Sequence, residues 1–176
     1  QMTQVDLRMF DDINDIKTYH IGSVLSGGSG APKNNTPKDW LDMVNGFQKI
    51  AMGNRLAIPI IYGVDAVHGH NNLRGAVLYP HNIGLGATRN IDLIRDISSA
   101  VAQDVYLSGL DLTFAPAVSV PVDDRWGRTY EGFSEEPELV AKMGKAAVEG
   151  YQGELNKDFL KKGKVLATAK HFIGDG

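Results

Sequence analysis

Asp65 is the first residue of this sequence whose position suggests chemistry. It directly follows an apolar run at residues 58–64 and stands in the tract Gly63-Val64-Asp65-Ala66-Val67-His68-Gly69-His70. An aspartate beside a buried segment is costly unless it is paired or hydrogen-bonded. An ionised carboxylate accepts hydrogen bonds on two oxygens, so Asp65 could hold two sugar hydroxyls at once. The alternative is a capping or ion-paired aspartate with a structural role only.

Histidines form a second group, made of His68, His70 and, nearby along the chain, His81. On an extended segment the His-x-His spacing places two imidazoles on one face, which suits a metal ion. No carboxylate or thiolate supplies an obvious remaining ligand. Hydrogen-bonded loop histidines are therefore the favoured interpretation, and we expect neither a metal nor another cofactor.

The third group lies in the tract Asp123-Asp124-Arg125-Trp126-Gly127-Arg128-Thr129-Tyr130-Glu131. A guanidinium binds vicinal hydroxyls or a carboxylate through two parallel hydrogen bonds. We expect ligand contact from one of the two arginines rather than from both. The alternative is a loop tied by internal ion pairs, with Trp126 as a packing anchor.

The fourth group is Lys170 and His171, in the tract Ala169-Lys170-His171-Phe172-Ile173-Gly174-Asp175-Gly176. In a regular strand these two neighbours would point to opposite faces. Both can reach one site only if the backbone bulges or turns there, and the glycines that follow permit this. Because Lys170 follows the apolar run 165–169, a free surface lysine is a poor interpretation.

Alternating strand-like and helix-like segments must position these groups. Strands are predicted over residues 21–25, 58–64, 112–120 and 165–172, and helices from about residue 37 to Gly53, from Asn90 to Gly109 and over 137–152. The expected inward stripe of the first helix is Trp40, Leu41, Val44, Phe47 and Ala51, at helical spacing. The order predicts an α/β fold with a parallel sheet.

Polar groups recur just after the predicted strands, where both barrels and open doubly wound sheets place their chemistry. The pattern alone does not separate half of a (β/α)₈ barrel from a small open sheet. The tract Gly84-Leu85-Gly86 is a poor nucleotide-binding turn, because it lacks a third glycine in register and does not open a helix directly after a strand.

Composition excludes several classes of function. The chain has 176 residues, 43% hydrophobic and 22% charged, which is typical of a globular domain. A net charge of -3 shows no basic excess, so we expect neither nucleic acid nor an anionic membrane as partner. The absence of cysteine excludes disulfides and thiolate metal sites. No apolar run reaches the roughly 20 residues of a membrane span.

Taken together, the tracts resemble glycoside hydrolase family 3, and more narrowly its β-glucosidase and exo-β-glucanase branch. The resemblance rests on the Asp65 tract, Tyr79-Pro80-His81-Asn82-Ile83-Gly84-Leu85-Gly86, Asp124-Arg125-Trp126-Gly127-Arg128 and Lys170-His171-Phe172-Ile173-Gly174-Asp175-Gly176, in that order. It covers essentially the whole chain. The N-acetylglucosaminidase branch typically carries a histidine where Asp175 stands, so the glucosidase branch is favoured.

The resemblance implies a role for each site residue. Asp65, Arg128, Lys170 and His171 would line the −1 subsite and hold the hydroxyls of a terminal β-glucosyl unit of a β-glucoside or β-glucan. Glu131 and Asp175, and more weakly His68, would support them from behind. The reaction would be retaining, exo-acting hydrolysis that needs no metal.

The resemblance also implies that residues 1–176 are about the first half, four β/α units, of a TIM-like (β/α)₈ barrel. The family's nucleophile and acid/base lie beyond the Lys-His-Phe motif, so we expect no catalytic carboxylate in this chain and an inactive fragment when it is alone. The rest of the barrel and a second α/β domain would then be a further chain or missing polypeptide. Secretion or a periplasmic location is expected. The alternative is a non-catalytic carbohydrate-binding or structural half-barrel.

Overall fold

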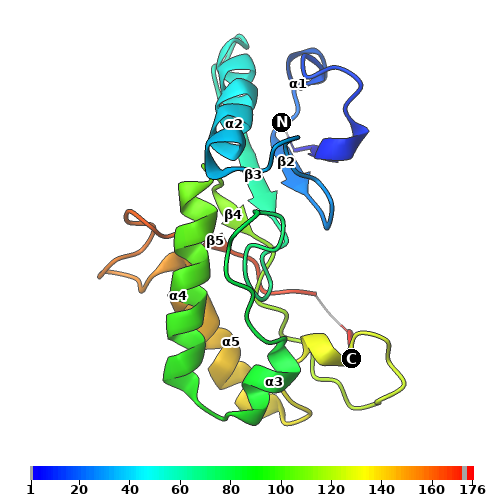
Figure 1. Ribbon diagram of the computed structural model, residues 1–176, viewed down its shortest axis with the longest axis vertical. Coiled ribbons are helices and arrows are strands. Elements are labelled where there is room, and N and C mark those ends of the chain that lie inside the picture. The colour runs from blue at the N-terminus through cyan, green and yellow to red at the C-terminus, as the bar shows by residue number, and fades with distance from the viewer. Residues whose placement is uncertain (1, 172–173) are drawn as a thin grey trace.

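The computed structural model describes residues 2–171 and 174–176 (Figure 1). Within these residues the structure has five short strands, five α-helices and two single-turn 3₁₀ helices, η1 and η2. In chain order the elements are β1 (Gln4–Asp6), η1 (Leu7–Met9), α1 (Asp15–Thr18), β2 (Ser23–Ser26), α2 (Pro37–Met52), β3 (Ile61–Val64), α3 (Asn82–Ala87), α4 (Ile91–Leu107), β4 (Leu112–Thr113), η2 (Thr129–Glu131), α5 (Pro137–Gln152) and β5 (Leu166–Ala167).

All strand pairs of the sheet are parallel, and their order in space, β1-β2-β3-β4-β5, is their order in the chain. A doubly wound sheet reverses its strand order at a switch point, whereas a barrel adds each strand beside the previous one. The sheet therefore follows the barrel pattern, which settles the question that periodicity left open. The predicted α/β class is confirmed.

The first long helix, α2, begins where its sequence predicts. Thr36 and Asp39 form a capping box, and Pro37 occupies the first turn, where a missing N–H costs nothing. The predicted inward stripe is buried at Trp40, Val44, Phe47 and Ala51. The inclusion of Leu41 was wrong, because this side chain is 41% exposed at the edge of the stripe, against Gly109.

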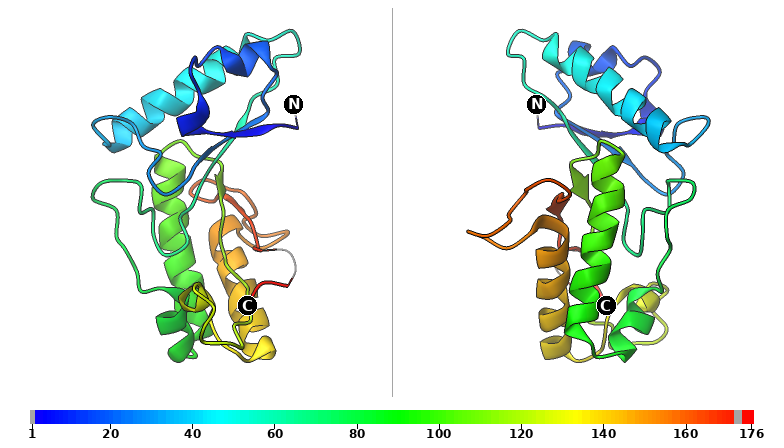
Figure 2. Two further views of the ribbon diagram at one scale, coloured as in Figure 1. Left: turned by 90° about the vertical axis from the view of Figure 1, so that its right-hand side faces the viewer. Right: turned by 60° about the vertical axis from the view of Figure 1, so that its left-hand side comes forward.

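Helices α4 and α5 lie side by side below the sheet (Figures 1 and 2). Both match the predicted segments, and α5 has the predicted bounds. Gly150 allows the close approach, since a Cβ there would lie 2.5 Å from the carbonyl oxygen of Arg95. Arg95 also donates to Glu149 across the two helices. Of this pair, α4 contacts β4 and α5 contacts β5.

The strands are shorter than predicted, and several elements were missed. Strand β4 stops at Thr113, and Pro116, which has no N–H to donate, follows shortly after it. Pairing beside β5 continues irregularly to an isolated bridge between Ala117 and Lys170. The predicted end of the last strand, Phe172, lies outside the described residues, as does Ile173. The missed strand is β1, so the sheet has five strands rather than four.

The short helices α1, η1 and η2 were also missed, as was α3, which falls in a stretch predicted to consist of turns. Among the described residues, no helix has the length and apolar character that a membrane span requires.

Candidate functional site

The predicted site residues gather beyond the carboxyl ends of β3, β4 and β5. Five of the seven, Asp65, His68, Arg128, Glu131 and Lys170, line a polar cavity of about 190 Å³ together with Val67, Asn71 and His81. The other two, His171 and Asp175, are joined to it through the contact of His171 with Arg128. A larger cavity of about 730 Å³ runs along α5 and is lined mainly by apolar side chains. It contains none of the charged residues that the sequence singled out, so the smaller cavity is the candidate site. In parallel α/β folds this edge of the sheet is where chemistry is placed.

An ion pair crosses the cavity between Asp65 and Lys170. Lys170 Nζ lies 2.8 Å from Asp65 Oδ1. The lysine side chain is only 14% exposed, whereas that of Asp65 is 37% exposed and faces the cavity. The interpretation of Lys170 as a free surface residue is thereby excluded. The pair places one cation and one acceptor oxygen at the same point of the site.

Arg128 is held by Glu131 on the neighbouring turn η2. Its Nε and Nη2 donate to the two carboxylate oxygens of Glu131 at 2.8 and 2.6 Å. This fork holds the pKa of Glu131 below its usual range and raises the pKa of Arg128. Buried Asn82, at the start of α3, donates to the Glu131 carbonyl oxygen at 2.8 Å and fixes the turn. The guanidinium therefore has a set orientation before any ligand arrives.

His171 links Arg128 to the segment that follows β5. Arg128 Nη2 lies 3.2 Å from His171 Nε2, and His171 Nδ1 lies 2.6 Å from Asp175 Oδ2. The Ser119 hydroxyl donates to the same Asp175 oxygen at 2.8 Å and, as the larger influence, holds the pKa of Asp175 below its usual range. Although adjacent in sequence, Lys170 and His171 both reach the site. The backbone has left the regular strand there, as predicted, and the peptide bond between them is cis.

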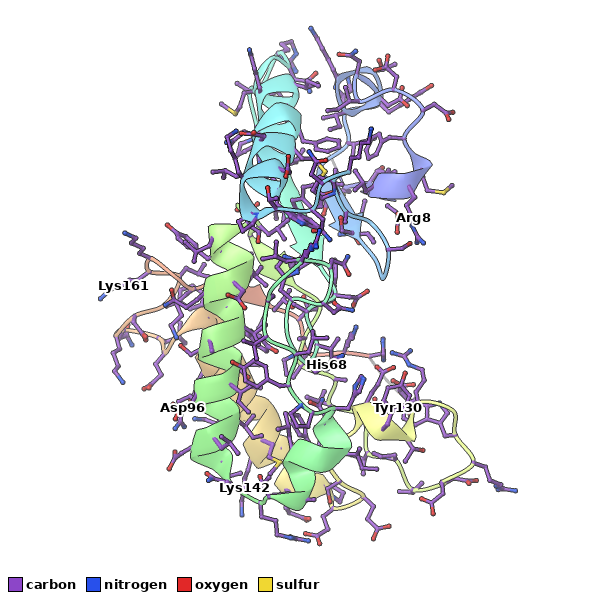
Figure 3. The ribbon with its side chains drawn as sticks, in the orientation of Figure 1. Arg8, His68, Asp96, Tyr130, Lys142 and Lys161 are labelled. Atoms are coloured by element: carbon purple, nitrogen blue, oxygen red, sulfur yellow. The ribbon has the colours of Figure 1, made fainter. Side chains whose placement is uncertain are left out.

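His68 and His81 form one wall of the cavity. Their rings stack with centroids 3.8 Å apart, and Tyr130 of η2 meets His81 edge-on at 4.6 Å. His68 Nδ1 lies 2.8 Å from the Tyr79 carbonyl oxygen. Because a carbonyl oxygen can only accept, the imidazole donates this hydrogen bond. Figure 3 shows His68 on the segment after β3 and Tyr130 on η2. Burial, and then the neighbouring His68, lower the pKa of His81.

The histidines do not gather as a metal site would require. His70 is fully buried against Trp40, with ring centroids 5.2 Å apart, while His68 and His81 line the cavity. Within residues 2–171 and 174–176, no three histidine, aspartate or glutamate side chains come together in a geometry that could hold a metal ion. The placement of His68, His70 and His81 therefore does not support the alternative of a metal site built from these three residues.

Only one of the two arginines reaches the site. Arg125 pairs instead with Asp123 on an exposed loop, its Nη2 2.5 Å from Asp123 Oδ2. Sequence reasoning missed Ser119, whose signal was a small polar residue in an apolar segment just before Pro121. It also missed the anchoring role of Asn82. Both contacts depend on segments that are distant along the chain.

Comparison with known proteins places this arrangement in a family. A model of the glycosyl hydrolase family 3 N terminal domain matches residues 1–176. The chain belongs to this family. The exo-1,3/1,4-beta-glucanase from a Pseudoalteromonas species superimposes with a TM-score of 0.94 at 46% identity, over 100% of this chain and 22% of that one.

Curated relatives agree with the family assignment. Lysosomal beta glucosidase of Dictyostelium discoideum is 39% identical over 99% of this chain and 24% of its own length. Periplasmic beta-glucosidase of Salmonella typhimurium is 35% identical over 70% of this chain and 15% of its own length. The chain thus spans a quarter or less of these family members.

The site combines donors and acceptors at close range. Lys170 and Arg128 donate, whereas Asp65 accepts, and all three line one cavity at the ends of parallel strands. A vicinal pair of hydroxyls needs this mixture, since each hydroxyl both donates and accepts. The cavity is therefore chemically suited to a polyhydroxylated ligand.

Proposed function

We propose that this chain supplies the sugar-binding part of a retaining, exo-acting β-glucosidase, which removes terminal β-D-glucosyl residues from β-glucosides or β-glucans. The observation that carries the proposal is the convergence of Asp65, Lys170 and Arg128 on one polar cavity, with His171 in contact with Arg128. Family membership and the names of the relatives, beta-glucosidases and an exo-glucanase, support the same substrate class.

In this proposal three residues of the cavity bind the terminal sugar directly and the others support them. Asp65 accepts hydrogen bonds from two hydroxyls, and Lys170 and Arg128 donate to the oxygens of neighbouring hydroxyls. Glu131 and Asp175 hold Arg128 and His171 from behind through the contacts at 2.6 Å described above. His68 and His81 close one side of the cavity. Hydrogen bonds to sugar hydroxyls that tighten in the oxocarbenium-like transition state contribute to catalysis.

The catalytic carboxylates are proposed to come from other parts of the polypeptide. Retaining hydrolysis needs a nucleophile and an acid about 5–5.5 Å apart. Each of the three carboxylates at this site already has a cationic or histidine partner: Asp65 with Lys170, Glu131 with Arg128, and Asp175 with His171. A paired carboxylate is a poor proton donor to a leaving group. These three are therefore assigned to binding and support.

We further propose that residues 1–176 form the first part of a (β/α)₈-like barrel domain, completed by polypeptide outside this sequence and followed by a second α/β domain. By this proposal the chain alone is inactive, because the acid and the nucleophile are absent from it. The relatives named periplasmic and lysosomal support a location outside the cytoplasm, either secreted or periplasmic.

The test uses the full-length protein with an aryl β-glucoside. Proton NMR during the first turnovers should show the β-anomer of glucose appearing first, as retention requires, and EDTA should leave the rate unchanged. Appearance of the α-anomer, or loss of activity with EDTA, would contradict the mechanism. Binding of glucose without any turnover would favour the alternative of a carbohydrate-binding half-barrel.

A further inference from the structure

The contacts of His171 define where its proton lies. A guanidinium has only donor groups, so His171 Nε2, 3.2 Å from Arg128 Nη2, must present its lone pair there. On the other side of the ring, Nδ1 lies 2.6 Å from Asp175 Oδ2, and an ionised carboxylate only accepts. Nδ1 must then carry the proton. The two contacts together select one neutral form of the ring.

Asp175 is itself oriented from a different part of the fold. The hydroxyl of Ser119, a side chain that is 5% exposed, donates to Asp175 Oδ2 at 2.8 Å. The same segments meet again at Gly176, where an added Cβ would lie 2.6 Å from the Val120 carbonyl oxygen. Close packing between residues 119–121 and 174–176 therefore fixes the carboxylate before it meets the imidazole.

We infer that Ser119 and Asp175 are positioning residues that hold His171 as the neutral tautomer protonated on Nδ1, so that Nε2 can accept a hydrogen bond from a substrate hydroxyl, which takes the place of the 3.2 Å contact with Arg128. The role toward substrate rests on the proposed function. In this arrangement one hydroxyl donates to His171 Nε2 while its oxygen accepts from Arg128 or Lys170. Asp65 is the matching acceptor on the other side of the cavity.

The inference predicts what happens when the ring loses its orientation. Without the Asp175 carboxylate, Nε2 no longer faces the substrate as an acceptor, and substrate affinity should fall. The effect should appear in KM more than in kcat, because the lost contact is already made in the ground state.

Neutron diffraction from crystals of the full-length protein at neutral pH tests the tautomer directly. Deuterium is expected on Nδ1 of His171 and not on Nε2. Deuterium on Nε2 would overturn the inference, whatever the enzyme cleaves. Conversely, the expected tautomer in a protein that does not cleave β-glucosides would count against the proposed function and leave the tautomer assignment standing.

Kinetics of variants tests the positioning role. Asp175→Ala should raise KM roughly tenfold to hundredfold, and Ser119→Ala about fivefold, as expected for a charged and a neutral hydrogen bond. Asp175→Asn retains an acceptor oxygen and should recover most of the loss. Ser99→Ala, which removes a hydroxyl that contacts Lys164 away from the site, is the matched control. Equal effects of Asp175→Ala and Asp175→Asn, or a loss in kcat with KM unchanged in Asp175→Ala, would overturn the inference.

Discussion

Lys170 Nζ donates a hydrogen bond of 2.8 Å to Asp65 Oδ1, across 105 positions of the chain. The contact joins the segment after β5 to the end of β3, so it can form only when the parallel sheet is assembled. It also leaves Asp65 facing the cavity with oxygen lone pairs available to a ligand. Binding chemistry and the alignment of two strands therefore depend on the same pair of side chains.

Replacement of Asp65 by alanine should abolish most of the activity of the full-length enzyme. The variant loses the contacts of Asp65 to two sugar hydroxyls and leaves Lys170 unpaired in a half-enclosed site. We expect kcat/KM for an aryl β-glucoside to fall by at least about a hundredfold, equivalent to several kcal/mol. Asp92→Ala, on the exposed face of α4, is the control. A kcat/KM close to that of the wild type in Asp65→Ala would remove Asp65 from the site.

Replacement of Glu131 by glutamine tests whether Arg128 must be pre-oriented. Glutamine offers one acceptor instead of the two that now receive the guanidinium, and it carries no charge. We expect KM to rise about tenfold with a smaller change in kcat. Glu138→Gln, on the exposed first turn of α5, should leave KM unchanged. If Arg128→Lys behaved as the wild type, the fork geometry would not matter and the argument would fail.

Two helical glycines should respond in opposite ways to alanine. At Gly150 of α5, a Cβ would lie 2.5 Å from the Arg95 carbonyl oxygen and 2.6 Å from the Ser98 Cβ, so α4 and α5 must separate. Gly150→Ala should lower the free energy of unfolding by about 2 kcal/mol. At Gly46 of α2 an added Cβ would have no neighbouring atom within 4 Å. Gly46→Ala should therefore raise the free energy of unfolding by about 0.5–1 kcal/mol. Denaturant unfolding of the full-length variants measures both, and stabilisation by Gly150→Ala would refute the packing argument.

His70 should make stability depend on pH below neutrality. Burial lowers the pKa of this histidine from 6.5 to about 4, and neither ring nitrogen has a hydrogen-bond partner among the described residues. Between these two values the unfolded chain binds the proton and the folded chain does not. The contribution of neutral His70 to the free energy of unfolding is therefore complete above pH 6.5 and is lost as the pH falls towards 4. The loss amounts to about 3 kcal/mol at most.

The measurement is the free energy of unfolding across this pH range in the wild type and in His70→Phe. Phenylalanine keeps a ring against Trp40 but does not titrate, so the slope should become shallower. Phe47→Leu, which removes a buried ring but no titratable group, is the control and should lower stability without changing the slope. Identical slopes in the wild type and His70→Phe would show that His70 is not responsible.

Much of the architecture could be predicted because it depends on local signals. The helices α2 and α5 have apolar faces at helical spacing and proline in the first turn, which fix their starts within the chain itself. Strand β1 was missed because its three residues, Gln4, Val5 and Asp6, have no apolar run and pair only through the sheet. Helix α3 was missed because its six residues include two glycines, which disfavour a helix.

The candidate site, too, could be predicted where local signals exist and could not where tertiary contacts decide. The positions of Asp65 and Lys170 beside apolar runs indicated partners, although the sequence did not show that each is the other's partner. The choice between Arg125 and Arg128 depended on which carboxylate each meets, Asp123 or Glu131, and this requires the fold of the loop. The position of Ser119 in an apolar segment is a weak signal, but its pairing with Asp175 could not be predicted, because the contact joins two segments through tertiary packing.

The central claim is that Asp65, Arg128, Lys170 and His171 together hold the terminal sugar. A crystal structure of the full-length protein with glucose tests it most directly. We predict that the ring lies in this cavity, with its hydroxyls within hydrogen-bond distance of the Asp65 carboxylate, the Lys170 ammonium, the Arg128 guanidinium and His171 Nε2. Glucose bound elsewhere, or bound here with the pair of Asp65 and Lys170 intact and out of reach of the sugar, would contradict the account.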